Sequence, residues 1–150
     1  MEVDVYIDPT NSGLGTTKVS DAYQASLNIG DKRQPFWALN TDDDSYRDVV
    51  RIAADVGFSF STAHNAQSIA LYNDIVSNPF KFVRVKAQGE NIGVSADELI
   101  QIDMAGKFDQ IEKQSDENGV FGFKYTFNAQ HNADMGGAYK IKVVNRLTGL

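Results

Sequence analysis

The feature of the sequence that most constrains the fold is an unbroken alternation of side-chain types over residues 50–62. Seven successive same-face positions are apolar or small: Val50, Ile52, Ala54, Val56, Phe58, Phe60 and Thr62. This period of two predicts a strand with one buried face, and its 13 residues would span roughly 43 Å. Strands in small domains are usually about five or six residues long. The segment is therefore expected either to project beyond its own sandwich as one arm of an extended hairpin, or to form two shorter strands joined by a bend at Gly57.

Composition also favours strands. Val, Ile, Phe, Tyr and Trp together number 39, whereas Leu and Met number 10. Branched and aromatic side chains suit a pleated, half-buried surface. Further alternation predicts strands near residues 3–8, 25–29, 82–87, 99–105, 121–129 and 139–147. We therefore expect a mainly β fold of two packed antiparallel sheets with one flanking helix, in a single domain over residues 1–150.

The one helix is expected around residues 66–77. Asn65 can cap its first turn, and Asn78-Pro79 can end it. Apolar residues at helical spacing form a stripe that is expected to pack on a sheet: Ile69, Tyr72, Ile75 and Val76.

Charge and cysteine content exclude several function classes. The formal net charge is −6, which argues against a protein that clamps duplex nucleic acid with a dense Lys/Arg face. Cysteine is absent, so disulfides, thiolate metal sites and cysteine nucleophiles are excluded. No apolar run approaches the roughly 20 residues that a membrane helix needs, and no membrane partner is expected.

The sequence contains few residues that could form a catalytic or metal-binding site. His64 could act as a general base, but no nucleophile stands in a recognisable context, and a local hydrogen bond at the strand–helix junction explains it more simply. His131 falls in a turn-like run and is expected to be a solvated loop residue. Asp42, Asp43 and Asp44 resemble a Ca²⁺ ligand cluster, but the EF-hand spacing is absent and a solvated turn is the simpler interpretation. We therefore expect no catalytic residue, metal or cofactor, and a structural or binding role.

Several segments, taken in order, resemble the major tail (tail tube) proteins of long-tailed bacteriophages, especially siphophages of actinobacteria. They cover most of the chain from about residue 20: residues 25–40 (ASLNIGDKRQPFWALN), 57–61 (GFSFS), the helix, 81–85 (KFVRV), 102–107 (IDMAGK), 118–123 (NGVFGF), 137–140 (GAYK) and 144–150 (VNRLTGL). Their order and spacing carry the resemblance. In such proteins this unit can follow an upstream segment, so the chain can be one part of a longer polypeptide.

The resemblance implies a β-sandwich with one helix that assembles with itself into stacked, usually hexameric, rings. Long hairpins of neighbouring subunits would form an inner barrel, through which double-stranded DNA passes without specific binding. It also implies a place in the virion after assembly in the host cytoplasm, with tape measure, tail terminator and tail tip proteins as partners. The subunit-interface candidates are Val50, Ile52, Ala54, Val56, Phe36 and Trp37, and Asp42, Asp43 and Asp44 are candidates for an acidic lumen or loop.

Two other functions remain open on the residues alone. One is a non-catalytic recognition or adhesion module, with Asp42 to Asp44 holding Ca²⁺. Such a sugar binder would expose aromatic platforms, whereas Trp37 lies in an apolar run typical of a core or an interface. The other is a hydrolase that uses His64.

Overall fold

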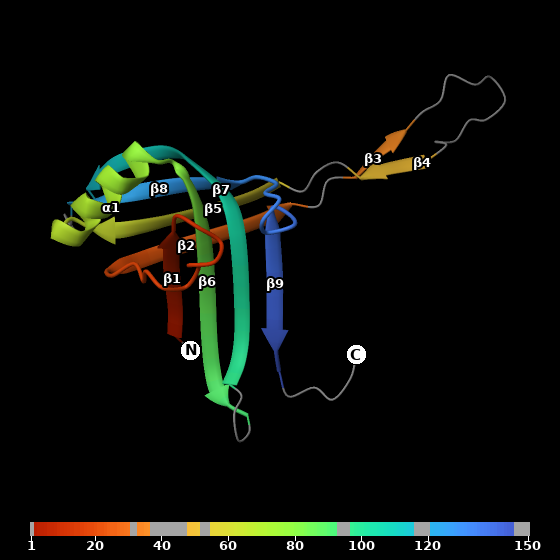
Figure 1. Ribbon diagram of the computed structural model, residues 1–150, viewed down its shortest axis with the longest axis horizontal. Coiled ribbons are helices and arrows are strands. Elements are labelled where there is room, and N and C mark those ends of the chain that lie inside the picture. The colour runs from red at the N-terminus through yellow and green to blue at the C-terminus, as the bar shows by residue number, and fades with distance from the viewer. Residues whose placement is uncertain are drawn as a thin grey trace.

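The computed structural model describes residues 2–30, 33–36, 48–51, 55–92, 97–115 and 121–145. These residues form nine strands and one helix (Figure 1). Their bounds are β1 Glu2–Asp8, β2 Ala22–Gly30, β3 Arg33–Phe36, β4 Asp48–Arg51, β5 Asp55–Ala63, α1 Ala66–Ser77, β6 Phe80–Asn91, β7 Asp97–Ser115, β8 Phe121–Ala129 and β9 Tyr139–Val144.

Seven strands form one antiparallel sheet in the order β1-β6-β7-β8-β5-β2, with β9 also paired to β7. The 19-residue β7 belongs to two layers, because its first half pairs with β6 and β9 and its second half pairs with β8. Figure 1 shows β1, β6, the first half of β7 and β9 crossing the strands β8, β5 and β2. The expected mainly β fold with one helix is confirmed, and the two layers are continuous through β7.

The corner in β7 depends on Gly106. A Cβ on this residue would lie 2.1 Å from the backbone oxygen of Asn128, so no larger side chain fits between β7 and β8 there. Two residues later the β7–β8 register shifts between Phe108 and Gln110, as a bulge does when it bends a strand.

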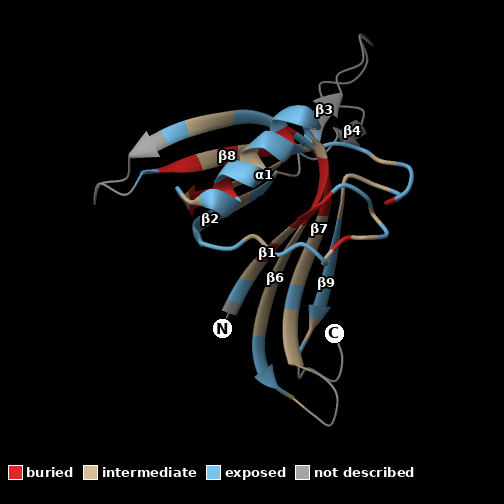
Figure 2. Ribbon diagram, turned by 60° about the vertical axis from the view of Figure 1, so that its left-hand side comes forward, coloured by how far each residue is buried: buried red, intermediate tan, exposed pale blue. Residues whose placement is uncertain are grey.

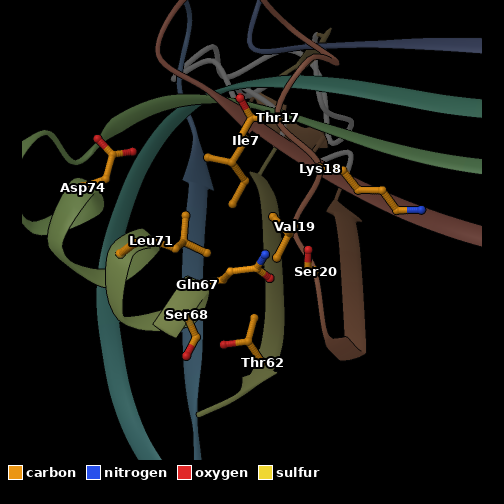
Figure 3. Close-up of a pocket in the computed structure, with 11 residues that line it drawn as sticks. Ile7, Thr17, Lys18, Val19, Ser20, Thr62, Gln67, Ser68, Leu71 and Asp74 are labelled. Atoms are coloured by element: carbon orange, nitrogen blue, oxygen red, sulfur yellow. The ribbon is translucent and has the colours of Figure 1, made fainter. Parts of the chain in front are cut away.

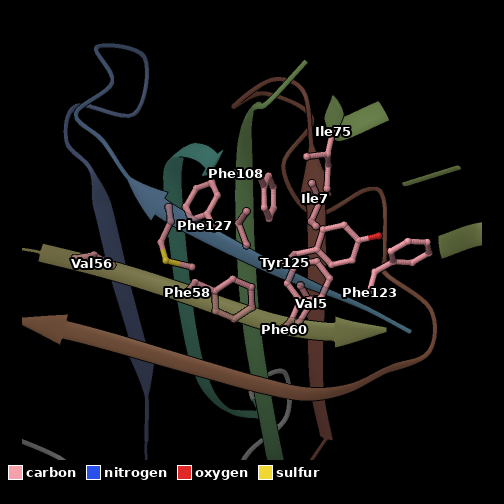
Figure 4. Close-up of a cluster of buried hydrophobic side chains, with 12 residues drawn as sticks. Val5, Ile7, Val56, Phe58, Phe60, Ile75, Phe108, Phe123, Tyr125 and Phe127 are labelled. Carbon is pink, nitrogen blue, oxygen red and sulfur yellow. The ribbon is translucent and has the colours of Figure 1, made fainter. Parts of the chain in front are cut away.

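An aromatic core fills the space between the layers (Figure 4). Phe60 of β5 stacks on Tyr125 of β8 with ring centroids 4.8 Å apart, and Phe108 meets Phe127 edge-on at 5.0 Å. Burial raises the pKa of Tyr125 to about 12. The Tyr125 hydroxyl donates to the backbone oxygen of Ser68 at 3.2 Å, which joins the core to helix α1.

Helix α1 begins and ends where the sequence predicts. The Asn65 side chain accepts from the Ser68 N–H at 2.8 Å, and the Ser68 hydroxyl accepts from the Asn65 N–H at 2.8 Å, which completes a capping box. At the other end, Lys81 of β6 is buried and pairs with Asp74 at 3.0 Å.

The predicted buried stripe of the helix is partly wrong. Ile75 is buried and Tyr72 packs against the core, but Ile69 is 41% and Val76 58% exposed. Ser68 occupies the contact instead, because its backbone accepts from Tyr125 and its small side chain lets the helix approach the sheet. The helix is thus rotated by about one residue position relative to the apolar stripe.

The long alternating segment is described as β4 and β5, and residues 52–54 between them lie outside the described residues. Val56, Phe58, Phe60 and Thr62 are all buried, as the alternation predicts. Gly57 pairs with Asn28 on one side and Asn128 on the other, so β5 continues through it. The alternative of two strands joined by a bend at Gly57 is wrong.

Candidate assembly interface

The layer formed by β2, β5, β8 and the second half of β7 has two open edges. β5 and β8 pair on both sides, whereas β2 pairs with β5 alone among the described strands. On the opposite edge, residues 109–115 of β7 pair with β8 but with no described strand on their other side. Just before this open segment, the Phe108 N–H of β7 donates to the Pro79 oxygen at 3.0 Å. Open strand edges are templates for pairing with another chain.

The strand directions allow the two edges to pair with each other in different copies. Three successive antiparallel pairings separate the second half of β7 from β2, so these two edge strands run in opposite directions. A second copy in the same orientation therefore presents its β7 edge antiparallel to β2 of the first. Such a head-to-tail contact repeats from copy to copy and closes into a ring when the rotation allows it.

The surface of this layer that faces away from the core carries mostly polar side chains. One row across the four strands contains Ser26, Ser59, Thr126 and Gln110. The next row contains Asn28, Gly57, Asn128 and Lys107. None of these residues was among the predicted site residues, although hydroxyl or amide residues alternate with aromatic ones in β5 and β8, and this pattern marks the outward face.

The extended hairpin predicted from residues 50–62 is described in two parts, and each part is paired within one chain. Gly30 pairs with Asp55, and beyond them Arg33 pairs with Arg51 and Phe36 with Asp48. β2–β3 and β4–β5 therefore remain partners along both described parts of the hairpin. Residues 57–62 of β5 are paired on both sides within the chain, so the edges of this layer that remain open to another copy are those of β2 and of residues 109–115 of β7.

The predicted interface and lumen residues fall mostly outside the described part of the chain. Val56 is described, and its side chain is buried in the core of its own chain. Val50 and Phe36 are described as members of strands β4 and β3, but their side chains are not. The remaining candidates lie outside the described residues: Ile52, Ala54, Trp37, Asp42, Asp43 and Asp44. Their roles stay predictions.

The second layer is anchored by charged groups near the end of β1. The buried Asp8 carboxylate accepts from the backbone N–H groups of Gly15 at 2.8 Å and Thr17 at 3.1 Å, and from Thr16. Burial acts to raise the pKa of Asp8, but these hydrogen bonds outweigh it and the pKa is lowered. Arg84 binds both carboxylate oxygens of Asp103, at 2.7 and 2.9 Å, and this pairing raises the pKa of Arg84.

A pocket of about 380 Å³ separates α1 from the segment that follows β1 (Figure 3). Ile7, Val19 and Leu71 supply apolar walls, and Gln67 and Asp74 of the helix face the same space. The pocket marks one flank of the helix, which lies toward β1. No group of three or more metal-ligating side chains occurs in the described ranges, and no helix there is long and apolar enough to cross a membrane.

The structure describes the positions of both histidines. The His64 N–H donates to the Phe121 oxygen at 2.8 Å, and the His64 ring lies 5.6 Å from that of Phe123. This bond is made by the backbone to another strand, so the predicted local hydrogen bond of His64 stays a prediction. His131 is exposed beside the turn of residues 132–137, as predicted.

Comparison with known proteins gives a shared fold and no family. No family model matches the sequence, and no curated protein matches it either. A chain of the virion of a native gene transfer agent particle superposes with a TM-score of 0.57 at 10% identity, over 93% of this chain and 96% of that chain. A chain from the tail of an empty gene transfer agent particle with C6 symmetry superposes with a TM-score of 0.55 at 8% identity, over 94% and 96%. This protein therefore has the fold of chains that build such particles.

Proposed function

We propose that this protein is a tail tube subunit, whose copies join edge to edge into stacked rings that form a DNA conduit. The observation that carries the proposal is the layer with two open, oppositely directed edges on one chain. The fold shared with a chain from a C6-symmetric particle tail supports the same role. In this proposal residues 1–150 act as one structural, non-catalytic unit of the virion.

The size of a closed ring is consistent with a conduit. Six copies of the four-stranded layer would contribute 24 strands. At about 4.8 Å between strands, they would give a circumference of roughly 115 Å and a backbone diameter of roughly 37 Å, which strand tilt would widen. Such a barrel has room for a DNA duplex inside its side chains.

The polar face of the layer suits the wall of that conduit. With the aromatic face turned toward each subunit's own core, the rows that contain Ser26, Ser59 and Thr126 would line the lumen. Most groups in these rows are uncharged hydroxyls and amides, the lysines of the face are Lys107 and Lys124, and Lys124 pairs with Glu112 across the strands. A net charge of −6 per copy repels the phosphate backbone. DNA would then slide without specific binding. Tape measure, terminator and tip proteins would meet the lumen and the ends of the tube.

A pair of neighbouring proline substitutions tests the open edge of β2. Successive N–H groups of an edge strand point alternately to the paired strand and away from it. Of Ala25→Pro and Ser26→Pro, one should therefore remove an N–H that faces β5, and the other an N–H that faces a neighbouring copy. Both residues are exposed, so neither change removes core packing.

We expect one variant of the pair to keep the wild-type circular dichroism and unfolding midpoint while losing rings or tubes under negative-stain electron microscopy. The wild type, at the same concentration, should form them. If the folded variants assemble like the wild type, β2 is not an assembly edge and the proposed ring is wrong.

A further inference from the structure

An apolar strip crosses the second layer beyond the region that the first layer covers. Val3, Ala87, Ile100 and Val143 form one row across β1, β6, β7 and β9, because each pairs with the next. Ile141 lies in the adjacent row of β9. Apart from the half-buried Ala87, these side chains are about half exposed, at 53% for Val3, 46% for Ile100, 56% for Val143 and 50% for Ile141. We call Val3, Ile100, Ile141 and Val143 the apolar strip.

The apolar strip is on the same face of its layer as the core. The adjacent rows toward the corner contain Val83 and Met104, both fully buried against the first layer. Figure 1 shows β1, β6, β7 and β9 continuing past β2, and Figure 2 shows the ends of these strands less buried than the parts near the corner. The strip therefore continues the apolar, core-facing side of the second layer past the open edge formed by β2.

A second exposed apolar surface lies on helix α1. Ile69 and Val76 are seven residues apart, so they share one flank of the helix, with Tyr72 between them. Tyr72 stacks on Phe123 of β8 at 5.3 Å, which places this flank on the side of β8. The other flank faces the pocket beside β1 (Figure 3). Because β8 adjoins the second half of β7, the Ile69–Val76 flank lies toward the open β7 edge.

These two surfaces therefore lie beside opposite edges of the same layer. In the proposed ring, β2 of a first copy pairs with β7 of a second copy. The apolar strip of the first copy then covers the second copy on the face that carries its core and its helix. Next to the β7 edge of the second copy, that face presents the Ile69–Val76 flank of α1.

We infer that the occupant of the apolar strip is a second copy of this chain, which docks the Ile69–Val76 flank of its α1 there. This contact rests on the proposed ring and adds to it a hydrophobic interface outside the barrel. The strip exposes roughly 300 Å² of apolar surface, within the range in which the largest patch of a monomer is often functional. A stable interface buries about 800 Å² on each partner, so edge pairing and the strip would act together.

Disulfide trapping tests this contact, because the chain contains no cysteine. Val76→Cys protein is mixed before assembly with each of Val3→Cys, Ile100→Cys and Val143→Cys, and the mixture is then oxidised. Lys142→Cys is the matched control, since Lys142 is an exposed neighbour of Val143 that points to the opposite face of β9. A disulfide requires Cα atoms within about 7 Å, so only close contacts are captured.

We expect at least one strip variant to give a cross-linked dimer with Val76→Cys at tenfold or more the yield of the Lys142→Cys control. Rings seen by microscopy without this excess would overturn the docking contact and leave the proposed tube intact. The excess without rings would support the contact and argue against the tube. Neither rings nor excess, at any concentration up to the solubility limit, would overturn both.

Discussion

At the scale of single residues, Asp8 fixes the path of the chain after β1. Its carboxylate gathers N–H donors from residues 15–17, which hold the following loop against β6, where Arg84 also donates to the Leu14 oxygen at 3.0 Å. A buried carboxylate is tolerated there because every hydrogen bond that it accepts favours the charged form. Asp8 was visible in the sequence merely as the end of a strand before Pro9, since its hydrogen-bond donors belong to a loop without periodicity.

Replacing Asp8 with Asn should lower the free energy of unfolding by about 1–3 kcal/mol at pH 7, because one acceptor oxygen is replaced by an amide NH2 donor that faces other N–H donors. The pKa of Asp8 is lowered in the fold from its ordinary value of 3.8. Its stabilising contribution is therefore present above that value and is lost as the pH falls toward the folded pKa.

Urea unfolding between pH 7 and pH 3 measures this effect. The stability difference between the wild type and Asp8→Asn should be constant above about pH 5 and should shrink below it. Asp134→Asn, which changes an exposed carboxylate in a loop, is the control and should track the wild type. A difference that does not change on acidification would contradict the assigned role of the Asp8 charge.

At the scale of elements, the helix shows what patterning can predict and what it cannot. Its bounds follow from local chemistry, because Asn65, Ser68 and Asn78 satisfy the helix ends with their own groups. Its rotation depends on tertiary contacts, because Tyr125 bonds the Ser68 carbonyl from a strand 57 residues away. Hydrophobicity alone therefore selected Ile69 and Val76 for burial in place of Ser68 and Leu71.

Two alanine substitutions in α1 separate these faces. Ile75→Ala should lower the free energy of unfolding by about 2–5 kcal/mol, because the side chain is 1% exposed among core residues. Ile69→Ala should change it by less than about 0.5 kcal/mol in the monomer, since that side chain is 41% exposed. Chemical unfolding of the two variants under identical conditions tests the rotation of the helix, and equal losses would contradict it.

At the scale of the whole molecule, the strands could be predicted but not their order. Alternation locates β5 and β8 because each has one buried face, yet it carries no information on which strand pairs with which. The bend at Gly106, which moves β7 from one layer to the other, depends on the close approach of the Asn128 backbone. The open edge of residues 109–115 follows from that bend, so the interface that we propose at this edge and at β2 could not be predicted from the alternation of residues 50–62.

The proposed assembly makes a prediction about salt. Each copy carries a formal charge of −6, so copies repel one another, whereas backbone pairing and the apolar strip involve few charges across the contact. Raising the salt concentration from 0.01 M to 1 M shortens the screening length from about 30 Å to about 3 Å, which weakens the repulsion and leaves the contacts. The concentration needed for ring formation should therefore fall as NaCl is added.

Sedimentation of assembled protein over a range of protein concentrations, at 0.01 M and at 0.5 M NaCl, measures this threshold. Asp134→Asn, with one negative charge fewer and no change at either edge, should shift the low-salt threshold slightly in the same direction as salt. Rings that dissolve on adding NaCl would mean that attraction between opposite charges holds the copies together. The basic face of β9, with Lys140 and Lys142, would then be the contact to examine, and neither the open strand edges nor the apolar strip could be the main source of stability.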